Sequence, residues 1–301
     1  MMILLAQQPT QAQTTIIGDE LPYSPYLYQE VGDAHDADLQ EKLDFLVSLR
    51  PEWRPLIQQR RMAVGIVDLH KPSQIRYAAI NGDHMMYAAS LPKIAVLLTA
   101  MECIADGSLA YDKDLKKDLR LMIAKSNNAA TTRVIDRVGM LRIAEVMQSP
   151  EYDLYDKHDG GGLWVGKRYA AAGMRNPEPL QGLSHAATVR QVCRYYTMLA
   201  YGQLVNDEMT AEMLKYLIDP KIYHKFVRAL RVRAPKARVY RKSGSWRTYH
   251  ADSAMVQGSG KRQYIIVALI EDANGSRICT ELISVAESAL GIVDPVVLPS
   301  K

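Results

Sequence analysis

The sequence predicts an α/β (α+β) fold, in which one sheet is built from both ends of the chain and a helical lobe is inserted between them. Strand patterns occur near the start and again after residue 232, whereas helical patterns dominate residues 88–223. The chain has 301 residues, 48% of them hydrophobic, which is enough to bury a large core. Strands from both ends that share a sheet leave a cleft where the inserted lobe meets it.

The N-terminal elements follow from the spacing of apolar residues. Residues 1–38 are polar and predict a tail, or the remnant of an export signal that begins with "MMILLA". Leucines and a phenylalanine at helical spacing predict a helix over 39–49, which Pro51 ends. The runs "MAVGIVDL" and "IRYAAI" predict adjacent strands over 62–69 and 75–80.

The remaining elements form the inserted lobe and the return to the sheet. Helices are expected over 90–104, 115–125, 129–138, 141–147, 188–204 and 210–218. Strands are expected over 237–244, 250–257 and 264–272, followed by a helix over 277–290. Residues 39–301 therefore form one domain, with an α/β lobe (39–87 and 233–301) and a helical lobe (88–232).

Composition excludes several classes of protein. No apolar stretch approaches the roughly 20 residues that a membrane-spanning helix needs, so no membrane span is predicted. The net charge is +4, and residues 228–242 are rich in Lys and Arg. This stretch predicts a solvated surface that attracts anions, with a dedicated polyanion site as the alternative; the chain shows no nucleic-acid-binding signature. The three cysteines predict buried free thiols.

Two other patterns do not predict sites. The seven histidines show no metal-ligand spacing, so we expect no metal and no cofactor. "GGLWVGKR" resembles the start of a phosphate-binding loop, but Arg168 stands where Ser or Thr would bind magnesium. We interpret this stretch as a shaped loop near the cleft.

The stretch "YAASLPKIAVLLTA" places Ser90 three residues before Lys93, where an apolar helix begins. Positions i and i+3 share one helix face, and free N–H groups at a helix start favour negative charge. Apolar neighbours lower the pKa of a lysine, so Lys93 could accept the serine proton. The pair alone is weak evidence, because S-x-x-K is expected about once by chance in such a chain. An N-cap serine followed by a surface lysine explains it too.

Two further motifs strengthen the hypothesis. "AKSNNAA" offers Ser126 and Asn128 between two predicted helices, and "YRKSGSW" offers Lys242, Ser243 and Gly244 on a late strand. K-[ST]-G is expected in only about one such chain in seven. The predicted topology brings these distant segments to the same cleft.

The three motifs together resemble those of the serine β-lactamases and penicillin-binding DD-peptidases, most closely the class A β-lactamases. The resemblance covers about 39–290 and implies a β-lactamase/transpeptidase-like fold with an antiparallel sheet. It implies that Ser90 is the acylated nucleophile, Lys93 its proton acceptor and Ser126 the proton relay to the leaving nitrogen. Its implied substrate-binding residues are Asn128, Lys242, Ser243, Gly244 and Ser245, the last completing the oxyanion hole with the Ser90 N–H.

This chain departs from the class A pattern. Asn127 replaces an aspartate, and the segment between Lys93 and Ser126 is short. The E-x-x-L-N string that supplies the deacylation base is absent; "EPLQ" makes Glu178 the nearest candidate, although a surface turn explains it equally well. His185 is expected to be a packing residue, and Arg247 is either a second carboxylate anchor or an exposed strand residue.

The resemblance implies a class A β-lactamase-like serine hydrolase that cleaves a β-lactam amide. A DD-peptidase or esterase on the same scaffold, acting on a D-Ala-type peptide or other acyl donor, is the first alternative. A non-catalytic binding module is the second. We expect a monomer that takes a small-molecule substrate and is periplasmic or secreted.

Overall fold

The computed structural model describes residues 21–293. The residues that carry the expected export-signal remnant, 1–20, lie outside the described part. The N-terminal end contains the helix α1 (Ala37–Ser48) and the short helix α2 (Arg54–Gln58). It also contains three short 3₁₀ helices, at Pro25–Leu27, Val31–Ala34 and Pro51–Trp53. None of the helices within 21–293 is long and apolar enough to cross a membrane.

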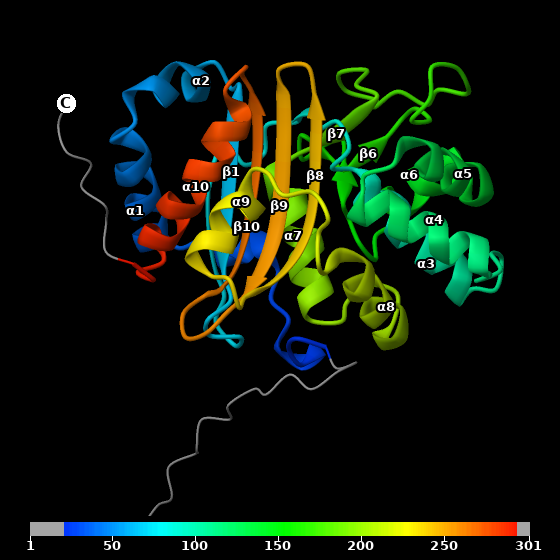
Figure 1. The fold of residues 1–301 in the computed structure, drawn as a ribbon, viewed down its shortest axis with the longest axis horizontal. Helices are drawn as coiled ribbons and strands as arrows, with labels where there is room; N and C mark the ends of the chain where they lie inside the picture. The colour runs from blue at the N-terminus through cyan, green and yellow to red at the C-terminus, as the bar shows by residue number, and fades with distance from the viewer. Residues whose placement is uncertain (1–20, 294–301) are drawn as a thin grey trace, which may run out of the picture.

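A five-stranded sheet joins the two ends of the chain, as the sequence predicts (Figure 1). Its strands are β1 (Met62–Asp68), β2 (Arg76–Ile80), β8 (Arg238–Trp246), β9 (Tyr249–Gln257) and β10 (Gln263–Glu271). They run in the order β2-β1-β10-β9-β8, and each neighbouring pair is antiparallel. β8 is therefore an edge strand that faces the helical lobe.

Helices cover both faces of this sheet and bury a separate core on each. α1, α9 (Phe226–Arg233) and α10 (Gly275–Ala289) lie on one face, and α7 (Val189–Ala200) packs against β1 and β10 on the other (Figure 1). Alternate residues of β10 serve the two cores: Ile266 faces α10, and Ile265 faces α7. α9 was not predicted, because its apolar residues are interspersed with arginines.

The inserted lobe consists of five helices and two small sheets. The helices are α3 (Lys93–Ala105), α4 (Lys113–Ala124), α5 (Asn128–Val138), α6 (Met140–Gln148) and α8 (Asp207–Leu217). β3 (Met86–Tyr87), β7 (His185–Ala187) and β6 (Trp164–Val165) form one small sheet, and β4 (Tyr155–Asp156) pairs with β5 (Gly161–Gly162). Strands this short carry no alternation that a sequence pattern can reveal.

Three predicted helix ends differ from the structure by three residues or more, and one of them is the start of α8, which lies at Asp207 rather than residue 210. α3 begins at Lys93 rather than Ser90, because Pro92 is the N-cap and the preceding residues form tight turns, with Lys93 N donating to Ser90 O at 3.4 Å. α7 ends at Ala200 rather than residue 204, because Gly202 adopts a left-handed φ of 69°. The three cysteines are buried and free, as predicted.

Candidate active site

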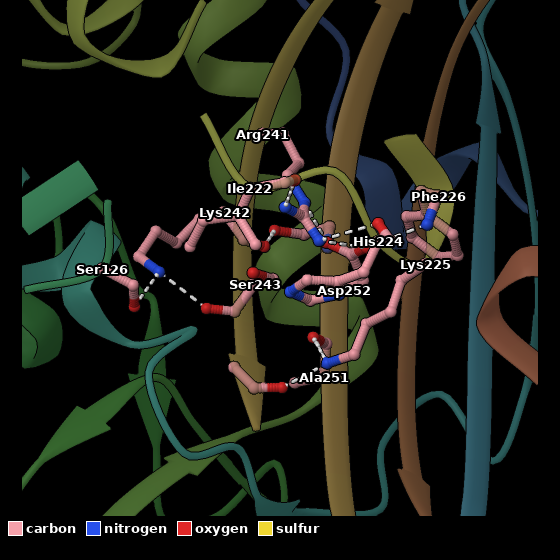
Figure 2. A network of polar contacts seen from close by, with 12 residues as sticks. Ser126, Ile222, His224, Lys225, Phe226, Arg241, Lys242, Ser243, Ala251 and Asp252 are labelled. Carbon is pink, nitrogen blue, oxygen red and sulfur yellow. Dashed lines mark hydrogen bonds and ion pairs between the residues drawn. The ribbon is translucent and has the colours of Figure 1, made fainter. Parts of the chain in front are cut away.

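Side chains from all three motifs meet at the edge of β8. The Lys93 ammonium nitrogen donates to Ser126 O at 2.7 Å and to Asn128 Oδ1 at 2.8 Å. The Lys242 nitrogen donates to Ser126 Oγ at 2.9 Å, as Figure 2 shows. Ser126 precedes α5, Lys93 begins α3 and Lys242 lies on β8, so the fold brings together residues that are more than 100 positions apart.

Ser90 is half-buried in the turn before α3, directly against β8. A Cβ atom added to Gly244 would lie 2.6 Å from Ser90 N, 2.8 Å from Leu91 N and 2.3 Å from Ala88 O. These separations are shorter than any van der Waals contact, so only glycine allows the strand to approach this turn. Gly244 thus lets β8 approach the backbone N–H groups of Ser90 and Leu91 closely.

Gly244→Ala is expected to push β8 away from the Ser90 turn. Overpacking of this kind costs about 1–3 kcal/mol of unfolding free energy. Urea unfolding monitored by circular dichroism measures that cost, and covalent labelling with benzylpenicillin measures the effect on the site. Gly32→Ala is the control, because a Cβ atom there meets nothing within 4 Å and the backbone is not in the left-handed region. Wild-type stability and labelling in Gly244→Ala would contradict the close approach.

Lys93 has the environment of a proton acceptor. Its side chain is fully buried, and this desolvation lowers its pKa to about 7. A neutral amine has two hydrogens and one lone pair; the two short bonds to Ser126 and Asn128 use the hydrogens and leave the lone pair to take up a proton. The ring of Tyr169 lies 4.4 Å from the same nitrogen and closes off another side.

Ser126 stands between the two lysines. Its hydroxyl oxygen lies 2.9 Å from the Lys242 nitrogen and 3.4 Å from that of Lys93. Burial, and then the charges of Lys93 and Arg241, hold the pKa of Lys242 well below its usual value. Ser126 has a left-handed φ of 53°, as does Ala89 beside the nucleophile, at 51°. Such backbone strain in non-glycine residues is frequent at functional sites.

A buried polar network supports β8 from the opposite face (Figure 2). Arg241 and Asp252 form a bidentate ion pair with N···O distances of 2.7 and 2.8 Å, and Arg241 also donates to Ile222 O at 2.9 Å. Lys225 donates to Gly244 O at 2.5 Å, to Ser245 Oγ at 2.8 Å and to Ala251 O at 3.0 Å. Gly244 O and Ser245 N belong to one peptide group, so Lys225 fixes the orientation of that N–H.

Lys225 is the clearest omission of the sequence analysis. It is buried, and a left-handed φ of 56° places it immediately before α9. A single lysine outside any motif gives no signal of such a position. The strained backbone and the three oxygen acceptors become evident only in three dimensions.

A cavity of about 720 Å³ opens beside these residues. Three kinds of residue line it. The loop between β6 and β7 contributes the cations Lys167, Arg168 and Arg175. The lining also includes Asn128, Tyr169 and His185 and the aromatic residues Tyr87, Trp246 and Tyr249. The expectation of a shaped loop near the cleft, based on "GGLWVGKR", is confirmed. Within residues 21–293, no group of three or more His, Cys, Asp or Glu side chains could hold a metal ion.

His185 and Arg247 have defined places in the structure. The His185 ring is buried, with Nε2 3.1 Å from Lys167 O, and burial lowers its pKa to about 4; it is the packing residue that the sequence predicted. Arg247 lies in the turn between β8 and β9, exposed, with its guanidinium 4.4 Å from the centre of the Trp246 ring.

The Glu178 carboxylate forms no described hydrogen bond or ion pair with the residues that meet at β8. The side chain is buried at the base of its loop, and its carboxylate accepts hydrogen bonds from Leu180 N and Gln181 N at 2.7 Å each and from the Tyr155 hydroxyl. It is not part of the cavity lining. These contacts are those of a turn, as in the alternative interpretation of this stretch, but the Glu178 side chain is buried and fixes the loop.

Glu178→Gln is expected to leave the lifetime of an acyl-enzyme unchanged and to destabilise the loop. The neutral amide loses charge-assisted acceptors for two backbone N–H groups, at a cost of about 1–3 kcal/mol. Stability follows from denaturant titration, and the lifetime from the decay of the labelled species. Glu151→Gln, at an exposed position, is the control. A longer lifetime in Glu178→Gln would restore the residue to the mechanism.

Comparisons with known proteins agree with this architecture. A model of the beta-lactamase enzyme family matches residues 114–290. A beta-lactamase structure from Sphaerobacter thermophilus DSM 20745 is 17% identical, with a TM-score of 0.66 over 85% of this chain and 98% of that one. A variant of PBP-A, described as an acyl-enzyme complex with penicillin-G, is 18% identical, with a TM-score of 0.62 over 86% and 98%.

An ancestral class A beta-lactamase is 15% identical, with a TM-score of 0.58 over 80% of this chain and 98% of its own. No match was found among curated proteins. At these identities the similarity to solved structures establishes the fold alone. The predicted β-lactamase/transpeptidase-like fold, with its antiparallel sheet and inserted helices, is confirmed.

Proposed function

Since the chain belongs to the beta-lactamase enzyme family, we propose that it is a serine hydrolase that opens a β-lactam amide through an acyl intermediate on Ser90 and releases the acyl group slowly. The observation that carries this proposal is the arrangement around Ser126. A buried lysine with a pKa near 7 and a second buried lysine both approach one hydroxyl, beside a half-buried serine.

In the proposed acylation step, the Ser90 oxygen attacks the carbonyl carbon and its proton moves to the neutral amine of Lys93. The carbon–nitrogen bond then breaks, and the leaving nitrogen takes a proton through the Ser126 hydroxyl. The N–H groups of Ser90 and Ser245 stabilise the oxyanion, where one donor commonly contributes about 3 kcal/mol. Lys242 and Ser243 attract the substrate carboxylate.

The slow release follows from the surroundings of Lys93. Its hydrogen bonds within the described part of the chain go to Ser126 and Asn128, and the Tyr169 ring covers a further side. The Tyr169 hydroxyl donates to Ala89 O at 3.1 Å, which anchors the ring beside the nucleophile. The neighbouring cavity is lined by no Asp or Glu, and none of the described hydrogen bonds of Lys93 and of the Ser126 hydroxyl goes to a carboxylate that could activate water.

The proposal extends to the natural substrate and the compartment. Slow deacylation suits a penicillin-binding DD-peptidase whose substrate is a D-alanine-type peptide, and PBP-A is a structural neighbour described with penicillin-G as an acyl-enzyme. Both substrate classes occur outside the cytoplasmic membrane, so we propose a periplasmic or secreted protein.

Intact-protein mass spectrometry with benzylpenicillin, followed from seconds to hours, tests the proposal. We expect an adduct with the mass of the whole antibiotic that persists long after mixing. An adduct that decays within seconds would indicate an efficient β-lactamase. A protein that never forms one would have neither activity and would favour the non-catalytic alternative.

A further inference from the structure

We propose that the cleft selects acyl donors whose side chain carries an additional anionic group, which Lys167 and Arg175 bind. This inference rests on the proposed function and specifies its substrate class. It concerns the part of the cavity that lies beyond Asn128, where the side chain of a bound acyl donor would extend.

The charge of this part of the cavity is unbalanced. Lys167, Arg168 and Arg175 line it, and its lining includes no Asp or Glu. Arg168 is neutralised by its ion pair with Asp136, but neither Lys167 nor Arg175 forms an ion pair with any residue in 21–293. The two remaining cations are held side by side, because residues 167 and 175 form an antiparallel backbone bridge.

The nearest acidic residue of the loop does not compensate them. The Glu178 carboxylate is buried, and its oxygens already accept two backbone N–H groups and the Tyr155 hydroxyl. His185, which also lines the cavity, is subject to the same charges: after burial, the charges of Lys93 and Lys167 lower its pKa, against a hydrogen bond to Lys167 O that raises it. An anionic ligand group is therefore attracted towards the Lys167–Arg175 side.

Another part of the cavity lining is aromatic and fits a flat apolar group. The Tyr87 ring lies 5.5 Å from that of Trp246 and 5.1 Å from that of Tyr249, measured between centroids. Trp246 and Tyr249 are stacked at an interplanar angle of 18°, and Trp246 is 48% exposed. A ligand side chain that combines a flat ring with a carboxylate could place the ring on the aromatic residues and the carboxylate on Lys167 and Arg175.

Three penicillins with the same phenylacetamido skeleton separate charge from shape. Carbenicillin carries a carboxylate on the side-chain carbon, ampicillin carries an ammonium group there, and benzylpenicillin carries neither. The second-order rate constant of Ser90 acylation is measured for each by competition with a fluorescent penicillin. We expect the order carbenicillin, benzylpenicillin, ampicillin, with about tenfold between the first and last at low ionic strength, and a smaller ratio in 0.5 M salt.

The double variant Lys167→Gln/Arg175→Gln is expected to bring this ratio close to one while the benzylpenicillin rate stays within about twofold of wild type. Lys157→Gln is the matched control, because it removes an exposed lysine of the same lobe that does not line the cavity. Equal rates for the three penicillins in the wild type, or an unchanged ratio in the double variant, would overturn the inference and leave the proposed function intact.

If no penicillin acylates Ser90, the proposed function fails, and equilibrium binding then tests the cavity by itself. Isothermal titration of the same three compounds is expected to give the same order of affinity, lost in the double variant. Equal affinities, or no binding by any of them, would overturn the anionic site.

Discussion

Ser90→Ala is expected to abolish the covalent adduct with benzylpenicillin completely. Alanine has no oxygen that could bond the carbonyl carbon, and no other described hydroxyl lies in the turn that packs against Gly244. Because Ser90 is only half-buried, loss of its hydroxyl leaves the fold intact. Intact mass spectrometry measures the adduct, and peptide mapping of the wild-type protein locates it.

Ser184→Ala provides the control for this experiment. Ser184 lines the cavity beside the site but has no part in the proposed steps, so its removal should leave adduct formation near the wild-type level. An adduct that survives Ser90→Ala, or that maps to another residue, would assign the nucleophile elsewhere.

Lys93→Met should slow acylation by about 10²–10⁴-fold, the range in which a positioned general base contributes. Methionine keeps much of the buried volume and contacts of the aliphatic chain but cannot accept the serine proton. The rate of adduct formation under excess benzylpenicillin gives the comparison. Lys117→Met, at an exposed position of α4 in the same lobe, controls for loss of a lysine.

The pH dependence of acylation provides a second test of Lys93. Its pKa is lowered to about 7 by desolvation, and only the neutral amine can act as acceptor. The rate should therefore rise with pH and level off above 7, with about a 50-fold increase between pH 5 and 7. His185, with a pKa lowered to about 4, stays neutral over this range. A profile that is flat through pH 7 would remove Lys93 from the step.

The sequence was sufficient to predict the residues that carry the three motifs. Ser90 and Ser126 lie next to helices, and Lys242 lies on a strand, and the sequence predicts all of these elements from apolar spacing. Predicting the elements therefore also predicts that the three motifs lie close together. The large sheet followed from the short apolar runs near both ends of the chain. The site residues followed from the three motifs and the family resemblance, whereas the elements that carry them followed from periodicity and chain order.

The remaining residues depend on packing that spacing does not encode. Glu178 has the right residue type near the right place, but two backbone N–H groups and Tyr155 hold it at the base of the loop. Tyr169 covers Lys93 because the loop after β6 brings its ring to the start of α3, where its hydroxyl donates to Ala89 O. Lys225 reaches the back of Gly244 across the sheet from a strained position.

The order of strands in the sheet also bears on how the protein is made. β1 hydrogen-bonds along its length to β10, with Met62 opposite Ile270, so its partner is synthesised about 200 residues later. At ordinary translation rates this delay is on the order of 10–40 s, during which a strand that is fully buried in the folded protein has one edge unpaired. A nascent chain therefore depends on protection by chaperones or by its own helical lobe until the last strands emerge, and the nucleophile's cleft is completed only when synthesis is almost finished.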